Sequence, residues 1–193
     1  SSYSYKYQFA KSKYLKFRIF GAYFLANSER QSASYANQLV RGSVALTSQG
    51  YTDQLYDDFY FGRNLQSGFL SRQIHFGEGN FKNALTSAYN LGLSNHFAFA
   101  INFEIDTPLK LKPYLDVGYY ASKLSEEAAF ENKTLYSIGF AIELIDETLG
   151  IYIPLINSQE IKDIYSQQSF LSRISFTMNL NKADPWKLVE ETY

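Results

Sequence analysis

The chain has 193 residues, enough for one domain with a sizeable core, and its formal net charge of −1 gives no general attraction to nucleic acid or to anionic surfaces. It contains no cysteine, which excludes disulfides, thiolate metal sites and cysteine nucleophiles. Aromatic residues are abundant, with 17 Tyr and 16 Phe, and no segment approaches the roughly 18 consecutive apolar residues of a transmembrane helix.

Two alternating runs open the chain. Residues 3–9 alternate Tyr or Phe with Ser, Lys and Gln, and residues 15–25 alternate large apolar residues with Lys16 and Arg18. Successive side chains of a β-strand point to opposite faces, so both runs predict strands with one apolar and one polar face. A long polar loop is predicted at 27–37. Alternation is weaker over 39–48 and 61–76, where strands are predicted without an assigned register.

The second half of the chain shows the clearest strands. After a loop at 77–94, residues 95–105 and 109–120 form a predicted hairpin around a tight turn at 106–108. Further strands are predicted at 135–145, 150–156 and 170–180. In each of them large apolar side chains alternate with small or polar ones.

The connections alternate in length. Short turns lie near residues 11, 107 and 147, and long loops separate the other strands. Outer-membrane barrels have short periplasmic turns, long external loops and strands of about ten residues. The pattern therefore predicts an all-β, antiparallel transmembrane β-barrel with about nine strands in this chain. Because single-chain bacterial barrels have an even strand number, residues 1–193 are predicted to be one barrel domain forming the C-terminal portion of a longer chain.

A soluble β-sandwich or a lipocalin-like barrel would also alternate. Soluble strands average about five or six residues, however, whereas several runs here reach roughly ten, which favours the membrane barrel. Tyrosine has an apolar ring and a polar tip, which suits the membrane–water interface.

The alternation assigns side chains to lipid or to lumen. The predicted lipid-facing residues are Phe97, Phe99, Ile101, Phe103, Ile138, Phe140, Ile142, Ile174 and Phe176. The predicted lumen charges are Lys16, Arg18, Glu104, Asp116, Glu143 and Arg173. Enclosed charges are costly unless paired, so these groups should pair across a narrow lumen. Arg173 is expected within hydrogen-bonding reach of Glu104, Asp116 or Glu143. A wider lumen lined by charge, serving as a translocation or ligand path, is the alternative.

Six segments carry a resemblance to a known family: LKFRIFGAYFL at 15–25, DDFYFGR at 57–63, FLSRQI at 69–74, GEGNFK at 77–82, YLDVG at 114–118 and GIYIPL at 150–155. Together they resemble the C-terminal domain of large aminopeptidase-N-like metallopeptidases from Bacteroidota. The resemblance covers nearly the whole chain. It implies a barrel that anchors an upstream catalytic region in the outer membrane.

The last five strands also look like the end of the surface-antigen superfamily, whose barrels insert or translocate outer-membrane proteins. That family has a long loop with a Val-Arg-Gly-Phe/Tyr motif, which folds into the barrel lumen. The corresponding lumen loop here is Gly77, Glu78, Gly79, Asn80, Phe81 and Lys82. Its Asn80-Phe81-Lys82 departs from the motif, and the Asp116-Val117-Gly118 strand matches the family better.

Catalytic patterns are missing from the sequence. The only histidines are His75 and His96, and neither begins the His-Glu-x-x-His of a zinc peptidase. No Gly-x-Ser-x-Gly elbow is present either. We therefore predict a non-enzymatic segment without metal or cofactor, so any zinc centre would lie upstream.

The predicted function is a barrel that anchors an upstream aminopeptidase-like region. The alternatives are a surface-antigen-type barrel for outer-membrane protein assembly or translocation, and an autonomous small barrel acting as adhesin or structural anchor. The expected partners are outer-membrane lipid, the upstream part of the same polypeptide and other outer-membrane proteins, but not nucleic acid.

Overall fold

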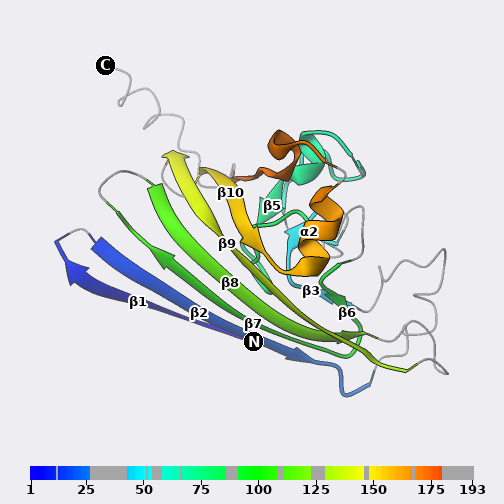
Figure 1. Ribbon diagram of the computed structural model, residues 1–193. Helices are drawn as coiled ribbons and strands as arrows, with labels where there is room; N and C mark the ends of the chain where they lie inside the picture. Colours follow the sequence, from blue (N-terminus) through cyan, green and yellow to red (C-terminus); the bar gives the residue numbers. More distant parts are fainter. Residues whose placement is uncertain are drawn as a thin grey trace.

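One large antiparallel sheet dominates the computed structural model (Figure 1). The structure describes residues 1–11, 13–26, 43–50, 52–53, 58–65, 67–85, 91–107, 111–122, 129–145, 148–166 and 168–179. The seven strands, in spatial order, are β1 (Ser2–Ala10), β2 (Lys13–Tyr23), β7 (Phe97–Ile105), β8 (Leu111–Ser122), β9 (Glu131–Ile145), β10 (Leu149–Asn157) and β11 (Ser175–Met178). β1 and β11 are the edge strands of this sheet.

A long segment between β2 and β7, here called the insert (residues 43–94), covers one face of the sheet (Figure 1). It contains β3 (Val44–Ala45), β4 (Ser48–Gln49), the 3-10 helix η3 (Leu70–Arg72), β5 (Ile74–His75) and β6 (Leu93–Ser94). β3 pairs with β6 and β4 pairs with β5, so the insert forms two small sheets of its own. We call the covered face the inner face and the opposite one the outer face.

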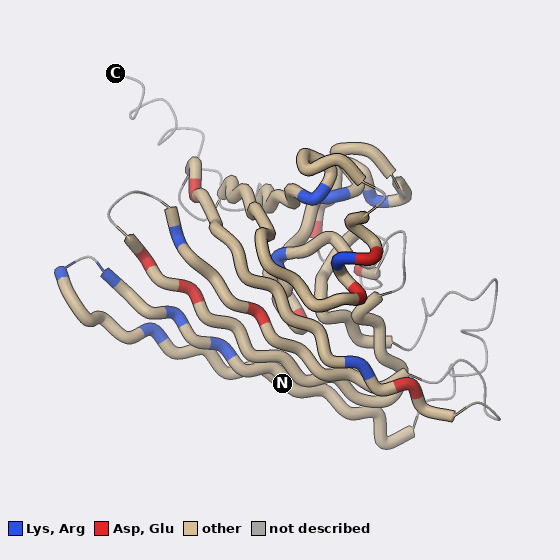
Figure 2. The backbone as a smooth tube through the Cα atoms, in the orientation of Figure 1, with Lys and Arg blue, Asp and Glu red and all other residues tan. Residues whose placement is uncertain are grey.

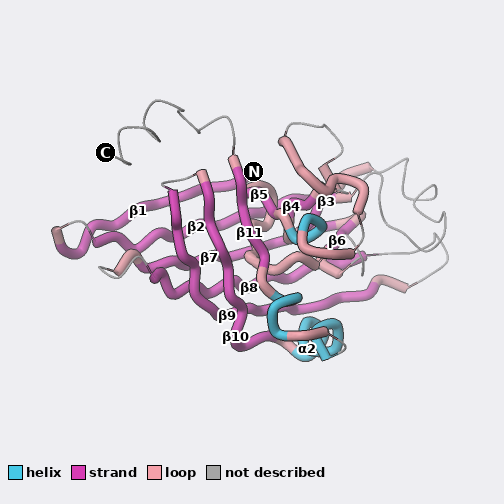
Figure 3. The backbone as a smooth tube through the Cα atoms, turned by 90° about the horizontal axis from the view of Figure 1, so that it is seen from above, coloured by secondary structure: helices cyan, strands magenta, loops and turns pink. Residues whose placement is uncertain are grey.

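The core lies between the insert and the inner face. Leu46, Phe81 and Leu85 of the insert pack in one buried cluster with Ala98, Ala100 and Leu135 of the sheet. The helix α2 (Gln159–Ser166) adds Ile161 and Tyr165 to that cluster. The small side chains of β7 leave room for the large ones of the insert. Figure 3 shows α2 at one side of the sheet, next to β10.

The predicted alternation is confirmed along the central strands. In β7, Phe99 is 41% exposed, while its neighbours Ala98 and Ala100 are 1% and 0% exposed. Large apolar residues of β7 and β8 meet on the outer face: Phe99 lies opposite Tyr119, and Phe103 lies opposite Leu115. The coarse prediction of an antiparallel all-β architecture therefore holds. No helix in the described ranges is both long and apolar enough to cross a membrane.

The strands predicted over 39–48 and 61–76 are much shorter in the described residues: only the two-residue strands β3, β4 and β5 form there, and they pair within the insert instead of joining the main sheet. β2 pairs directly with β7, with Phe20 opposite Ala100, and the described part of the main sheet has seven strands rather than about nine. Near Gly68, which has a φ of +89° and is followed closely by η3, the chain turns instead of extending. Residues 39–42 and 66 lie outside the described residues.

The final strand is also shorter than predicted. Residues Phe170–Arg173 form the 3-10 helix η4, and only Ser175–Met178 pair with β10. Phe176 lies opposite Ile151 on the outer face, yet it is only 6% exposed. The reason is Phe69 of the insert, whose ring stacks on Phe176 with centroids 4.7 Å apart.

Candidate functional site

Charged side chains on the inner face form a network across four strands and one turn. The inner-face charge network consists of Lys16, Glu104, Asp106, Lys112 and Glu143. Lys16 lies directly opposite Glu104, and its Nζ is 3.1 Å from Glu104 Oε1. Lys112 Nζ is 2.6 Å from Glu143 Oε2 and 2.8 Å from Asp106 Oδ1. Lys16 also lies 3.8 Å from Glu143, which joins the two halves.

Strand register explains this arrangement. Opposite residues of neighbouring antiparallel strands lie side by side on the same face, so one lysine per strand can reach the carboxylates of the next. The Lys16 side chain keeps 38% of its exposure, and that of Lys112 keeps 13%. Water therefore screens part of the network, and its individual pairs are weaker than fully enclosed ones.

A second, buried contact ties the insert to the sheet. Lys82 Nζ lies 3.2 Å from Asp116 Oδ1, and the two side chains are 2% and 0% exposed. The Lys82 backbone N–H donates to Asp116 Oδ2 at 2.9 Å, and Asn102 Nδ2 donates to Oδ1 at 2.9 Å. Because three donors surround one carboxylate, its charge is paired without water. Lys82 and Asp116 are called the buried pair below.

Two glycines let the loop at residues 77–82 come this close. A Cβ on Gly118 of β8 would lie 2.8 Å from Phe81, and one on Gly79 would lie 2.5 Å from the Leu46 backbone. Asn102 Nδ2 also donates to the Gly79 carbonyl at 3.1 Å. The loop is thus held by backbone contacts as well as by the buried pair. Phe81 itself is 1% exposed.

The remaining loop residues Glu78 and Asn80 have positive φ values of 41° and 56°. Glu78 accepts a hydrogen bond from the Ala45 backbone N–H. Burial, assisted by the nearby Asp53, raises the pKa of Glu78 to about 7. The Glu78 carboxyl therefore holds its proton well above the pH at which a solvated glutamate loses it.

Two of the predicted lumen charges, Arg18 and Arg173, form no ion pair within 4.0 Å with a described carboxylate. Arg18 Nη1 donates to Asn102 Oδ1 at 3.4 Å, and its guanidinium lies over the Phe20 ring. Arg173 differs from the prediction: it lies on η4 and donates to the Tyr165 carbonyl at 3.2 Å. The 3-10 turn replaces the extended backbone that would have aimed Arg173 at the sheet. The ion pairs of the described residues include neither arginine.

The predicted lipid-facing residues lie mostly on the outer face of β7 and β9. These are Phe97, Phe99, Ile101, Phe103, Ile138, Phe140 and Ile142, and each is exposed or half-buried. Ile174 follows η4 and is half-buried, while Phe176 is covered by Phe69. The outer-face positions of β8 from Leu111 to Tyr119 and of β9 from Thr134 to Leu144 carry no Asp, Glu, Lys or Arg.

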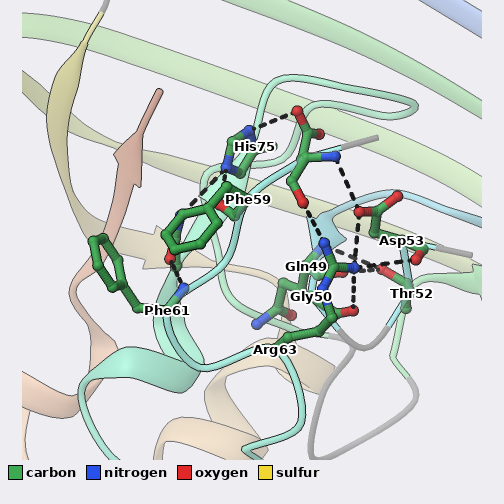
Figure 4. A network of polar contacts seen from close by, with 10 residues as sticks. Gln49, Gly50, Thr52, Asp53, Phe59, Phe61, Arg63 and His75 are labelled. Carbon is green, nitrogen blue, oxygen red and sulfur yellow. Dashed lines mark hydrogen bonds and ion pairs between the residues drawn. The ribbon is translucent and has the colours of Figure 1, made fainter. Parts of the chain in front are cut away.

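The insert also contains a polar network that no pattern in the sequence predicts (Figure 4). Arg63 Nη1 lies 2.9 Å from Asp53 Oδ2, and His75 Nδ1 lies 3.1 Å from Asp58 Oδ1. Gln73 Nε2 donates to the Phe59 carbonyl at 2.8 Å, and Gln73 Oε1 accepts from the Phe61 N–H at 2.8 Å. Gln73 thus satisfies backbone groups that a strand partner would otherwise bind, which holds the loop carrying Phe59 and Phe61.

A cavity of about 630 Å³ lies between the inner face and the insert. Cations line it from the sheet edge (Lys6, Lys16 and Arg18), and carboxylates line it from neighbouring strands (Glu104 and Glu143). In the described part of the chain, no group of three or more His, Asp or Glu side chains is placed to hold a metal ion.

No protein-family model, curated protein or solved structure matches this chain. The features of the chain that bear on its function are the two faces of the sheet and the contacts of the insert.

Proposed function

We propose that this chain is a non-catalytic part of an outer-membrane β-barrel wall, which anchors an upstream aminopeptidase-like region to the membrane. One observation carries the proposal: the outer-face positions of β8 from Leu111 to Tyr119 and of β9 from Thr134 to Leu144 hold no charged residue, while the inner face holds the charges. A surface that faces lipid is expected to lack charges, because a Lys or Arg at the bilayer midplane costs about 2–4 kcal/mol.

Strand length supports a membrane wall. β8 has 12 residues and β9 has 15, whereas a tilted strand crosses the hydrocarbon core with roughly 9–11 residues. The connections alternate as well. β1–β2, β7–β8 and β9–β10 are joined by short turns, and the intervening connections are long. Short and long connections at opposite ends are typical of outer-membrane barrels.

The inner face supports an anchor more than an open channel. The insert fills the space above β7 and β8 with apolar side chains, and the buried pair fixes it to the wall. A filled interior suits a membrane attachment better than a conducting pore, whose lumen is an open aqueous channel. The upstream catalytic region itself rests on the resemblance of the six sequence segments.

A second candidate is a surface-antigen-type barrel for outer-membrane protein assembly or translocation. The loop at residues 77–82 favours it, because this loop contacts the sheet at Asp116 and Gly118. Both residues belong to the segment that resembles that superfamily. The cation next to Asp116 is Lys82, a point charge. It lacks the bidentate fork of an arginine such as the one in that superfamily's Val-Arg-Gly-Phe/Tyr motif.

The membrane assignment can be tested by accessibility, because the chain has no native cysteine. Single-cysteine variants Phe140→Cys on the outer face and Ser4→Cys on the exposed inner edge would carry the same fluorophore after refolding into phosphatidylcholine vesicles. We expect a lipid-soluble quencher to reach only position 140 and aqueous iodide to reach only position 4. Equal quenching of both positions by iodide would overturn the membrane assignment.

A further inference from the structure

The free edge of β1 is the largest unpaired backbone surface of the main sheet. β1 pairs with β2 from Ser2 to Ala10 and has no strand on its other side in the described structure. All nine of its residues are exposed. Unpaired N–H and C=O groups along a strand of this length form a template for another strand. An edge of this kind in a membrane would be especially costly, because lipid offers no hydrogen bonds.

The charge of this edge is one-sided. Residues 1–26 contain five Lys or Arg and no Asp or Glu. On the inner face Lys6 lies directly opposite Lys16, although like charges at opposite positions of neighbouring strands repel. Figure 2 shows this edge dominated by Lys and Arg, with Asp and Glu on the neighbouring strands.

Lys16 belongs to the inner-face charge network, whereas Lys6 and Arg18 form no ion pair with any carboxylate of the described residues. Lys6 Nζ lies 3.9 Å from the centre of the Tyr14 ring, and Arg18 donates to the Asn102 amide oxygen and lies over the Phe20 ring. Among the described residues, neither cation takes part in an ion pair within 4.0 Å. Both line the cavity between sheet and insert. Excess positive charge therefore faces the unpaired side of the sheet.

We propose that the β1 edge binds an extended strand with carboxylates on its inner face and apolar side chains on its outer face, supplied by the rest of the barrel wall. Its carboxylates lie beside Lys6 and Arg18, and its apolar residues continue the outer row of Tyr3, Tyr5 and Tyr7. This inference rests on the proposed function, because a closed wall needs a partner at this edge. Beyond that function, the inference specifies which side chains the partner strand carries on each of its faces.

Two other occupants fit less well. A second copy that paired β1 with β1 would bring two sets of Lys6, Lys16 and Arg18 together without an added carboxylate. Closure by the other edge of the same sheet is limited by length, because β11 has four residues and β1 has nine. The free side of β11 is also partly occupied, since Gln73 forms a bridge with Phe176.

The experiment uses the 193-residue chain in detergent micelles and nine-residue peptides that alternate Val with Glu or Val with Lys. Lys6→Glu reverses the charge at the edge. Lys11→Glu makes the same charge change in the exposed turn and is the matched control. Peptide affinity is measured by fluorescence anisotropy at low salt and in 1 M salt. A Glu peptide with proline at its centre tests for strand pairing, because proline removes a ladder hydrogen bond.

We expect the Glu peptide to bind at least tenfold more tightly than the Lys peptide at low salt, with a smaller ratio in 1 M salt. Lys6→Glu should reverse this preference, Lys11→Glu should preserve it, and the central proline should abolish binding. Equal affinity for both peptides, or an unchanged preference in Lys6→Glu, would overturn the proposal. Disulfide-linked dimers of Ser4→Cys without peptide would instead identify a second copy as the occupant. The vesicle accessibility experiment tests the membrane assignment separately, so the two proposals fail independently.

Discussion

The sheet and the insert are stabilised in different ways. In β7, β8 and β9 inner-face and outer-face residues alternate regularly. These strands pair with one another in continuous register. The insert has only two-residue strands and depends on individual polar contacts such as those of Gln73 and Lys82. Substitutions in the sheet should therefore act according to the face they occupy, whereas substitutions in the insert should act through single partners.

The largest expected effect breaks the contact between the two regions. Lys82→Ala leaves Asp116, which is 0% exposed, without its cation, so the free energy of unfolding should fall by about 3–5 kcal/mol. Urea unfolding from detergent micelles measures this change. Lys133→Ala is the matched control: it removes a 3.4 Å ion pair with the exposed Glu131 and should cost less than about 1 kcal/mol.

Restoring neutrality should recover much of the loss. In the double variant Lys82→Met with Asp116→Asn no buried charge remains, so it should be more stable than Lys82→Ala alone. If Lys82→Ala proves no more harmful than Lys133→Ala, the buried pair does not attach the insert to the sheet.

The next prediction compares the same substitution in the two regions. Phe99 on the outer face of β7 and Phe61 in the insert are 41% and 49% exposed, so exposure alone would predict similar effects. Phe99→Arg should destabilise the vesicle-inserted protein by about 2–4 kcal/mol, because the charge would enter lipid. Phe61→Arg should change stability by less than about 0.5 kcal/mol. Urea titration in vesicles measures both, and equal effects would contradict a lipid-facing outer face.

This contrast also explains what the sequence could predict. The alternation of β7, with Phe and Ile between Ala, Asn and Glu, follows from strand geometry alone, and the structure has the predicted faces. The inner-face charge network follows from the same alternation, because Lys16 and Glu104 are opposite in register. Asp106 was assigned only to a turn, and its contact with Lys112 depends on the path of that turn.

The insert was not predictable in the same way. Its residues contact partners far along the chain, such as Lys82 with Asp116, and no periodicity encodes such pairs. The strands predicted over 39–48 and 61–76 form only as two-residue strands, and the side chain of buried Gln73 binds backbone groups of Phe59 and Phe61 within the insert. The prediction for Arg173 failed for a local reason, since η4 replaces the first residues of the final strand.

A smaller effect should appear on changing pH. The pKa of Glu78 is about 7 in the folded insert and 4.5 in a solvated chain, so the folded state holds the proton more tightly. The contribution of Glu78 to stability is therefore greatest below pH 4.5 and is lost as the pH rises through about 7. Because Glu78 is half-buried, we expect a loss of about 1–2 kcal/mol. Glu78→Gln should remove this dependence in urea unfolding at pH 5 and pH 8, and an unchanged dependence would contradict the assignment to Glu78.

The smallest predicted effect concerns a charge of the sheet itself. Lys16→Met removes the ion pair with Glu104, but Lys112 still lies within 2.8 Å of Glu143 and Asp106. The Lys16 side chain is 38% exposed, so water solvates Glu104 once the lysine is gone, and stability should fall by only about 0.5–1 kcal/mol. Salt should reduce this difference, because it screens exposed charges. If Lys16→Met instead lowered stability as much as Lys82→Ala, and 1 M salt did not change the loss, the inner-face charge network would be as enclosed as the buried pair. Charges of the sheet would then depend on single contacts just as those of the insert do.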